Sequence, residues 1–243
     1  WSQVRILCDP PLIFLFYSSK LMKLFFNSIA SALKRITLSF TKESILAGFF
    51  FFLVLCSWYI LRPVRNEMAV QNSEILPYLL GIGALVMLLL NPVYSWLASR
   101  KNLRGVLVGC YSFFISNLLG FIILWKFFDL SSSIVLSQIF YIWCNVYSFF
   151  VVSIFWVVII NLFRGDNAAN VFGVIAAGGS LGAYLGSEIS KQLASTFNES
   201  GIIFFTMIAI VFLCLALITG LVLMQRFSNL KGINESPGGS SFD

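Results

Sequence analysis

The stretch Ser44–Leu61, SILAGFFFFLVLCSWYIL, decides the fold class of this 243-residue chain. It holds 18 consecutive residues without a charge, and a helix needs about 20 predominantly apolar residues to cross a bilayer. The whole chain has the same character: 59% of its residues are apolar, 11% are charged, and its mean hydropathy is +0.91. Soluble domains carry roughly 25% charged residues, so the composition excludes a soluble globular protein and predicts a membrane protein.

Five further apolar runs are long enough to cross the membrane. Together with the first run they predict an all-α polytopic membrane protein, in which six transmembrane helices form one bundle over residues 44–226. The lipid bilayer is therefore its main surrounding. The five runs are Leu76–Ala98, Val106–Trp125, Ile134–Phe163, Ala168–Leu193 and Ile202–Met224.

The basic residues predict how this bundle is oriented. The formal net charge is +6, but the Lys and Arg residues are scattered between apolar runs, which favours a topological role over nucleic-acid binding. If the first helix leaves the cytoplasm, only four of the 16 Lys and Arg residues lie on the opposite side. The positive-inside rule then places both termini in the cytoplasm. The four residues are Arg62, Arg65, Lys126 and Lys191.

The two ends of the chain have a different composition from the bundle. We expect residues 1–21 to be a non-native or disordered leader, with Met22 as the candidate start. Residues 22–43 have apolar residues at helical spacing among lysines and arginines, which predicts a basic amphipathic segment at the cytoplasmic surface. Residues 227–243 contain a Pro/Gly/Ser-rich stretch and predict a flexible cytoplasmic tail or linker.

The residue types needed for catalysis are missing or badly placed. The chain has no His, which removes the commonest general base and transition-metal ligand. The sequence Gly178–Gly182, GGSLG, matches the pattern of a hydrolase nucleophile elbow, but no His can activate Ser180 and no strand precedes it. We therefore expect no enzyme activity, no catalytic residue, no metal site and no cofactor.

The first candidate site follows the Ser44–Leu61 run, where two arginines and a glutamate stand close together. Ionisable groups at the end of a span are unfavourable unless they are paired or face water. Pro63 disfavours a helical conformation at Arg62, which would turn Arg62 and Arg65 toward a central cavity as donors for phosphate or carboxylate. Alternatively, both arginines extend to lipid headgroups and Glu67 neutralises one of them. The candidate substrate-binding residues are Tyr59, Arg62, Arg65, Asn66 and Glu67.

The second candidate site is the basic turn between the second and third runs. Residues 95–104, SWLASRKNLR, resemble the G-x-L-A-D-R-x-G-R-R loop motif of the major facilitator superfamily. Leu97, Ala98, Arg100 and Arg104 match that motif. The resemblance implies that Arg100 and Arg104 belong to a loop that controls the conformation of the transporter, although any short cytoplasmic turn can carry such charges.

The third candidate site is a glycine stripe in the fifth run. Gly178, Gly182 and Gly186 recur every four residues and therefore form a smooth face on which another helix can pack closely. In a transporter such a face suits two helices that move past one another during alternating access. Static close packing would produce the same pattern.

Taken together, residues 58–68 (WYILRPVRNEM), the basic turn and residues 172–186 (FGVIAAGGSLGAYLG) resemble the bacterial and plastid nucleotide transporters, a family of ATP/ADP exchangers. The first span of that family ends in a pattern like I-L-R-x-x-K/R-D. Ile60, Leu61, Arg62 and Arg65 match this pattern, with Asn66 where Asp is usual. The resemblance implies that Arg62 and Arg65 contact the nucleotide phosphates, and that the chain lies in a bacterial inner membrane.

Members of that family have about twelve spans in two facing six-helix bundles, and this chain supplies one bundle. The expected partner is a missing or separately encoded second half, or a second copy in a homodimer. We therefore expect half of a secondary transporter that moves a small anionic, nucleotide-like solute by alternating access. The alternatives are a major-facilitator transporter of an unrelated solute and a truncated or non-transporting membrane protein.

Overall fold

A computed structural model describes five stretches of the chain: residues 41–71, 73–127, 133–163, 168–196 and 201–234. The chain divides into two compact units, Trp1–Thr41 and Lys42–Asp243, and the second unit contains all the helices described below. The leader expected over residues 1–21 lies outside the described residues. So does the amphipathic segment expected over residues 22–43, apart from its last three residues.

Within the described residues the second unit is entirely helical, with six long helices and a short 3₁₀ helix, η2 (Ser73–Ile75). Five of the long helices are long and apolar enough to cross a membrane: α2, α3, α4, α5 and α7. The protein is therefore a multi-pass membrane protein. The long helices are α2 (Lys42–Gln71), α3 (Leu76–Ala98), α4 (Leu103–Phe127), α5 (Ile134–Leu162), α6 (Ala168–Thr196) and α7 (Gly201–Asn234).

Helix α6 is the exception to the prediction of six apolar spans. It coincides with the fifth predicted run, but it is not among the helices apolar enough to be counted as spans. Its composition explains the difference, because glycine, serine and alanine take the places of larger apolar residues and because Glu188 and Lys191 fall within it.

Helices α2 and α7 extend furthest beyond the predicted boundaries. Helix α2 continues through Pro63 to Gln71, so the expectation that Pro63 disfavours a helical conformation at Arg62 is wrong. Helix α7 continues to Asn234, through residues 227–234 that were assigned to the flexible tail. The next proline after this stretch is Pro237, and until that point no residue prevents the helix from continuing.

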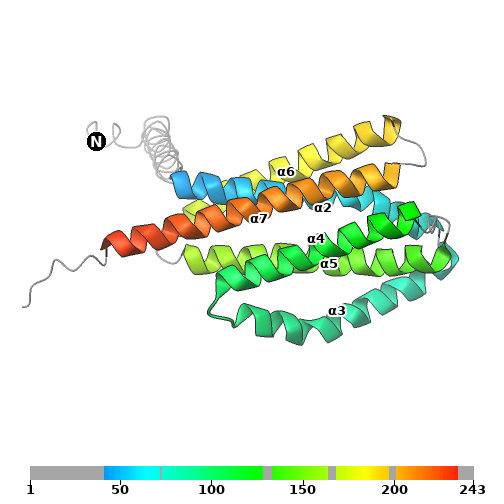
Figure 1. The fold of residues 1–243 in the computed structure, drawn as a ribbon, viewed down its shortest axis with the longest axis horizontal. Helices are drawn as coiled ribbons and strands as arrows, with labels where there is room; N and C mark the ends of the chain where they lie inside the picture. Colours follow the sequence, from blue (N-terminus) through cyan, green and yellow to red (C-terminus); the bar gives the residue numbers. More distant parts are fainter. Residues whose placement is uncertain (1–40, 72, 128–132, 164–167, 197–200, 235–243) are drawn as a thin grey trace, which may run out of the picture. The chain divides into compact units, whose positions relative to one another are not determined.

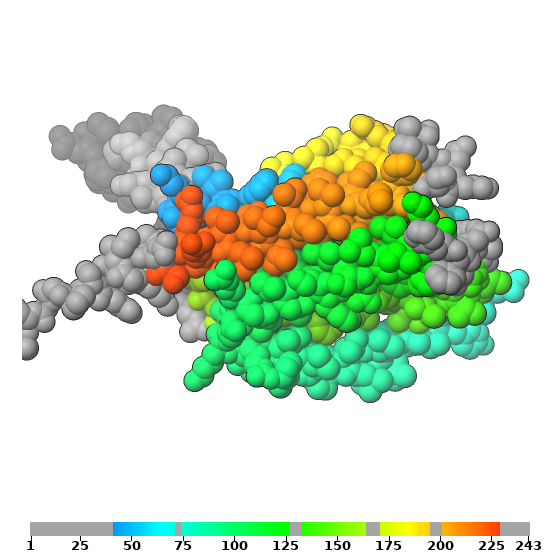
Figure 2. Space-filling view, viewed as in Figure 1, coloured from blue at the N-terminus to red at the C-terminus, as the bar shows by residue number. Residues whose placement is uncertain are grey.

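Helix α2 is the centre of the bundle and packs against α5, α6 and α7. Helix α5 packs against α2, α3 and α4, and α4 also packs against α7. The four helices α3, α5, α2 and α6 are thus neighbours in that order, and α4 and α7 cover one side of the central pair. Figure 1 is viewed from this side, with α7 in front of α2 and α4 in front of α5, and Figure 2 shows the surface that α7 and α4 form.

Aromatic rings fill most of the space between the central helices. Phe50 of α2 meets the ring of Phe155 on α5 edge-on, with centroids 4.9 Å apart. Deeper polar groups are paired: the Tyr147 hydroxyl lies 2.6 Å from Ser57 Oγ, and Ser57 Oγ donates to the carbonyl of Ala209 at 2.8 Å. These contacts join α2, α5 and α7, and they pair the buried hydroxyls of Ser57 and Tyr147.

The glycine stripe of α6 lies directly against α2. A Cβ atom at Gly178 would overlap the backbone of Gly48, and one at Gly182 would lie 2.8 Å from Phe52 Cα. The Cys56 thiol donates to the carbonyl of Gly182 at 3.2 Å. The Gly48–Gly178 and Phe52–Gly182 contacts both join residues 130 positions apart, so the two helices run parallel in constant register. Only glycine permits this close approach.

Candidate functional site

The candidate site begins with the way α2 passes through Pro63. A proline has no N–H, so the carbonyl of Tyr59, four residues earlier, lacks its normal helical donor. Ser190 of α6 supplies a replacement, because its hydroxyl donates to the Tyr59 carbonyl at 3.2 Å. Ser190 follows Gly186 at the same four-residue spacing and is buried. The stripe therefore ends in a hydroxyl at the point where α2 needs a donor.

Beyond this contact an open pocket of about 440 Å³ lies between the C-terminal parts of α2 and α6. Four of the five predicted substrate-binding residues line it. Helix α6 contributes two hydroxyls and an ammonium group to the same pocket. The lining residues are Tyr59, Arg62, Pro63, Asn66, Glu67 and Val70 of α2, and Ser187, Ser190, Lys191 and Ala194 of α6.

The charges of this pocket are only partly balanced. Lys191 Nζ lies 3.9 Å from Glu188 Oε2 on the same helix, and its side chain is 79% exposed. The Arg62 guanidinium lies over the Tyr59 ring, 5.5 Å from its centroid. Among the described residues no carboxylate lies within 4.0 Å of Arg62. Glu67 therefore does not neutralise Arg62, as the alternative of arginines extending to lipid headgroups allowed. Arg62 therefore keeps its donors available to a ligand.

Arg65 lies in different surroundings and does not line this pocket. Three positions along a helix turn a side chain by about 60°, and this directs Arg65 toward α5. Its Nη1 donates to Asn145 Oδ1 at 3.0 Å, and its Nη2 donates to Asn66 Oδ1 at 3.1 Å. The guanidinium lies over the rings of Trp58 and Tyr141, at 5.7 Å and 5.5 Å. Its Nε is buried and has no hydrogen-bond partner among the described residues.

A second pocket, whose lining includes the aromatic residues Trp58, Tyr59 and Phe149, adjoins the first one. It has a volume of about 450 Å³, lies between α2, α3 and α5, and shares Tyr59 with the pocket that contains Arg62. Aromatic faces such as these accept planar ligands by stacking. Its lining residues are Leu55, Trp58, Tyr59, Met87, Ser148, Phe149, Val152 and Ser153.

The basic turn lies between the end of α3 and the start of α4, whereas the Arg62 pocket lies near the other end of α3. The Arg100 guanidinium stacks on the ring of Trp96, 3.8 Å from its centroid. Asn102 begins α4, because its side chain accepts a hydrogen bond from the N–H of Gly105 at 2.9 Å. Arg104, in the first turn of α4, is exposed. The two predicted loop residues therefore both point away from the helix core.

Several residues of the site were not predicted from the sequence. Ser190 could have been found, since it continues the four-residue spacing of the glycines. Tyr141 and Lys191 had no such signal, because their roles depend on which helices lie next to α2. Comparison with protein-family models, with curated proteins and with solved structures finds no match to this chain.

Proposed function

We propose that this chain is one half of an alternating-access secondary transporter for a small anionic solute, and that a nucleotide is the solute class it fits best. The observation that carries the proposal is Arg62, an exposed guanidinium without a carboxylate within 4.0 Å among the described residues. A permanently charged group at the end of a membrane helix is unfavourable unless it meets water or an anion. An anionic substrate would supply the negative charge that Arg62 lacks.

The combination of pockets supports a nucleotide over a simple carboxylate. The pocket with Arg62 and Lys191 offers guanidinium, ammonium and hydroxyl donors suited to phosphate. The adjoining pocket offers Trp58 and Phe149 as surfaces for a planar base. Because Tyr59 belongs to both pockets, one ligand with a phosphate end and an aromatic end can occupy both at once.

The pairing of the helices supports a transporter half. If the first three helices of the bundle are matched in order with the last three, the contacts of α2 with α6 and α7 correspond to the contacts of α5 with α3 and α4. Repeated three-helix units of this kind occur within each six-helix half of major-facilitator transporters. The face of α2 that bears Tyr59 and Arg62 would then line the path of the solute.

The proposal includes six crossings with both termini in the cytoplasm of a bacterial inner membrane, and a second half or second copy opposite the Arg62 pocket. The register of α6 with α2 supports the sixth crossing. Gly178–Ser190 lies alongside Gly48–Ile60, which is part of a candidate span, so α6 runs at the same depth. Close packing of its small residues compensates for its low hydropathy.

The test is equilibrium binding of radiolabelled ATP to the purified full chain in lipid nanodiscs. Arg62→Gln removes a charge-assisted hydrogen bond and is expected to weaken binding about tenfold or more. Arg226→Gln is the matched control, because it removes the same charge from an exposed position on α7 that lines neither pocket. Equal affinities of the two variants would remove Arg62 from the site.

Competition and flux separate the alternatives. Unlabelled ADP should displace ATP, whereas citrate at the same concentration should not. Stronger displacement by citrate would favour a transporter for a different organic anion. Binding that is never accompanied by exchange in proteoliposomes, even after the partner half has been supplied, would favour a membrane protein that does not transport.

A further inference from the structure

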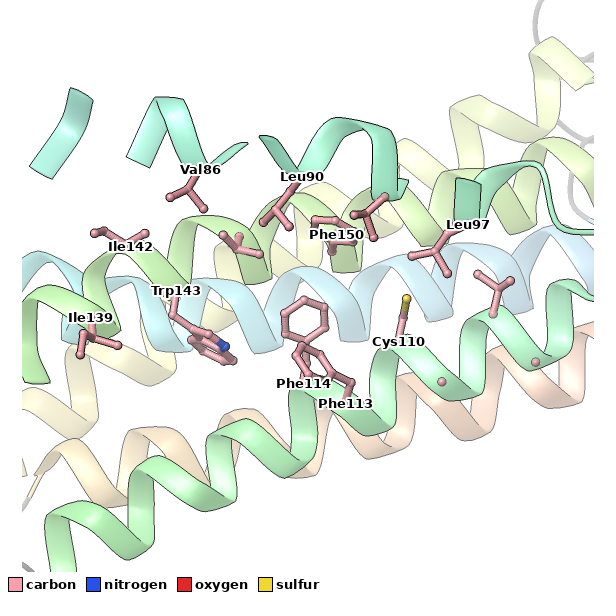
Figure 3. Close-up of a pocket in the computed structure, with 15 residues that line it drawn as sticks. Val86, Leu90, Leu97, Cys110, Phe113, Phe114, Ile139, Ile142, Trp143 and Phe150 are labelled. Carbon is pink, nitrogen blue, oxygen red and sulfur yellow. The ribbon is translucent and has the colours of Figure 1, made fainter. Parts of the chain in front are cut away.

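An apolar pocket of the bundle lies away from the Arg62 pocket. It has a volume of about 620 Å³ and lies between α3, α4 and α5. In Figure 3, Val86, Leu90 and Leu97 point into it from α3, and Cys110, Phe113 and Phe114 line it from α4. Among its lining side chains, only those of Trp143 and Cys110 contain a nitrogen or sulfur atom, and the indole nitrogen of Trp143 is buried. We call this pocket the α3/α4 slot.

The α3/α4 slot is long, and part of its wall on α4 is formed by glycine. Its lining on α3 runs from Val86 to Leu97, a distance of about 16 Å along a helix. On α4 the lining includes Gly105 and Gly109, and a Cβ atom at Gly109 would have no other atom within 4 Å. The slot therefore has the length and the chemistry to hold an extended hydrocarbon chain.

A cluster of positive charge lies at one end of the slot. Leu97 and Gly105 line the slot, and the basic turn between them carries Arg100, Lys101 and Arg104, all of which are exposed. Among the described residues none of the three has a carboxylate within 4.0 Å. The stacking of Arg100 on Trp96 is typical of side chains at the boundary between lipid and water.

We propose that the α3/α4 slot binds an anionic phospholipid, with one acyl chain in the slot and the headgroup phosphate on the basic turn. Helices α3, α4 and α5 are all candidate membrane spans, so the hydrocarbon that reaches the slot is an acyl chain of the bilayer. Each Lys or Arg near the membrane surface attracts anionic lipid, and the turn carries three of them. This inference does not depend on the proposed transport of an anion.

The test uses the full chain in phosphatidylcholine nanodiscs that contain a small fraction of phosphatidylglycerol with a photoreactive group in one acyl chain. After irradiation, mass spectrometry locates the labelled peptides. We expect labels on the segments Val86–Leu97 and Gly105–Phe114, and we expect unlabelled phosphatidylglycerol to reduce them far more than phosphatidylcholine does. Labels spread evenly over all helices, or equal competition by phosphatidylcholine, would overturn the proposal.

Two variants test the chain and the headgroup separately. Gly109→Leu places a side chain in the slot, at a position where no other atom lies within 4 Å of the Cβ atom, and should abolish labelling there, whereas Gly120→Leu is the matched control. Gly120 is on the same helix, also has open space around it and lies outside the slot, so its labelling should equal that of the wild type. Replacing Arg100, Lys101 and Arg104 together by Gln should weaken phosphatidylglycerol competition at least about tenfold. Unchanged labelling of Gly109→Leu would refute the acyl-chain part of the site. Unchanged phosphatidylglycerol competition in the triple Gln variant would refute the headgroup part.

Discussion

Arg62 and Arg65 are neighbours on one helix, but their surroundings differ because side chains three positions apart on a helix point in directions about 60° apart. Arg62 faces an open pocket together with α6, whereas Arg65 is held by Asn145 and by two aromatic rings. A guanidinium between aromatic faces is stabilised by about 0.5–2 kcal/mol. Arg65 therefore fixes α2 against α5 and adds positive potential, and Arg62 is the one left free to contact a solute.

Ser190 and Pro63 are expected to depend on each other. Ser190→Ala removes the donor to the Tyr59 carbonyl and should destabilise the protein by about 1 kcal/mol. In a Pro63→Ala background the backbone N–H of residue 63 can take over that carbonyl, so Ser190→Ala should then be nearly neutral. Thermal unfolding of the four variants in detergent measures this coupling. Equal losses in both backgrounds would show that the serine does not compensate for the proline.

At the scale of helices, α2 and α6 form the closest pair, because glycine brings their backbones together over several turns. Gly182→Ala adds a Cβ atom 2.8 Å from Phe52 Cα, and one of the helices must move. Overpacking of this kind typically destabilises a protein by about 1–3 kcal/mol.

Gly173→Ala provides the control for Gly182→Ala, since Gly173 is on the same helix with no atom within 4 Å of its Cβ position. Alanine has the higher helix propensity, so this variant should be as stable as the wild type or slightly more so. Chemical or thermal unfolding of the two variants provides the comparison. A similar loss in both would mean that glycine acts through the backbone of α6 and not through its contact with α2.

At the scale of the whole molecule, the crossing of α6 decides the side on which the chain ends. If all six helices cross, residue 101 in the basic turn and residue 241 near the C-terminus lie on the same side. If α6 does not cross, they lie on opposite sides. The constant register of α6 with α2 leads us to expect the same side.

Single cysteines at Lys101 and at Ser241, in a variant without the five native cysteines, test this topology with a reagent that cannot cross the membrane. Both should react only in inside-out vesicles, as the distribution of basic residues predicts. A third cysteine at Glu199, between α6 and α7, should react only from the other side. Labelling of residues 101 and 241 from opposite sides would show five crossings.

The apolar runs and their spacing determined much of this protein. They predicted the number of long helices, and they predicted α3 with its observed bounds, because hydrophobic length is a local property of the chain. The periodic glycines likewise identified a face suited to close packing before any neighbour was known.

The tertiary structure decided which helix meets that face and how the arginines are used. The carbonyl of Tyr59, which Pro63 leaves without its helical donor, is paired with Ser190 of another helix, and no local rule contains that information. Pocket residues such as Lys191 and Tyr141 are brought to α2 from positions far along the chain. Sequence spacing describes one helix at a time, whereas a binding site is formed by the side chains that several helices place together.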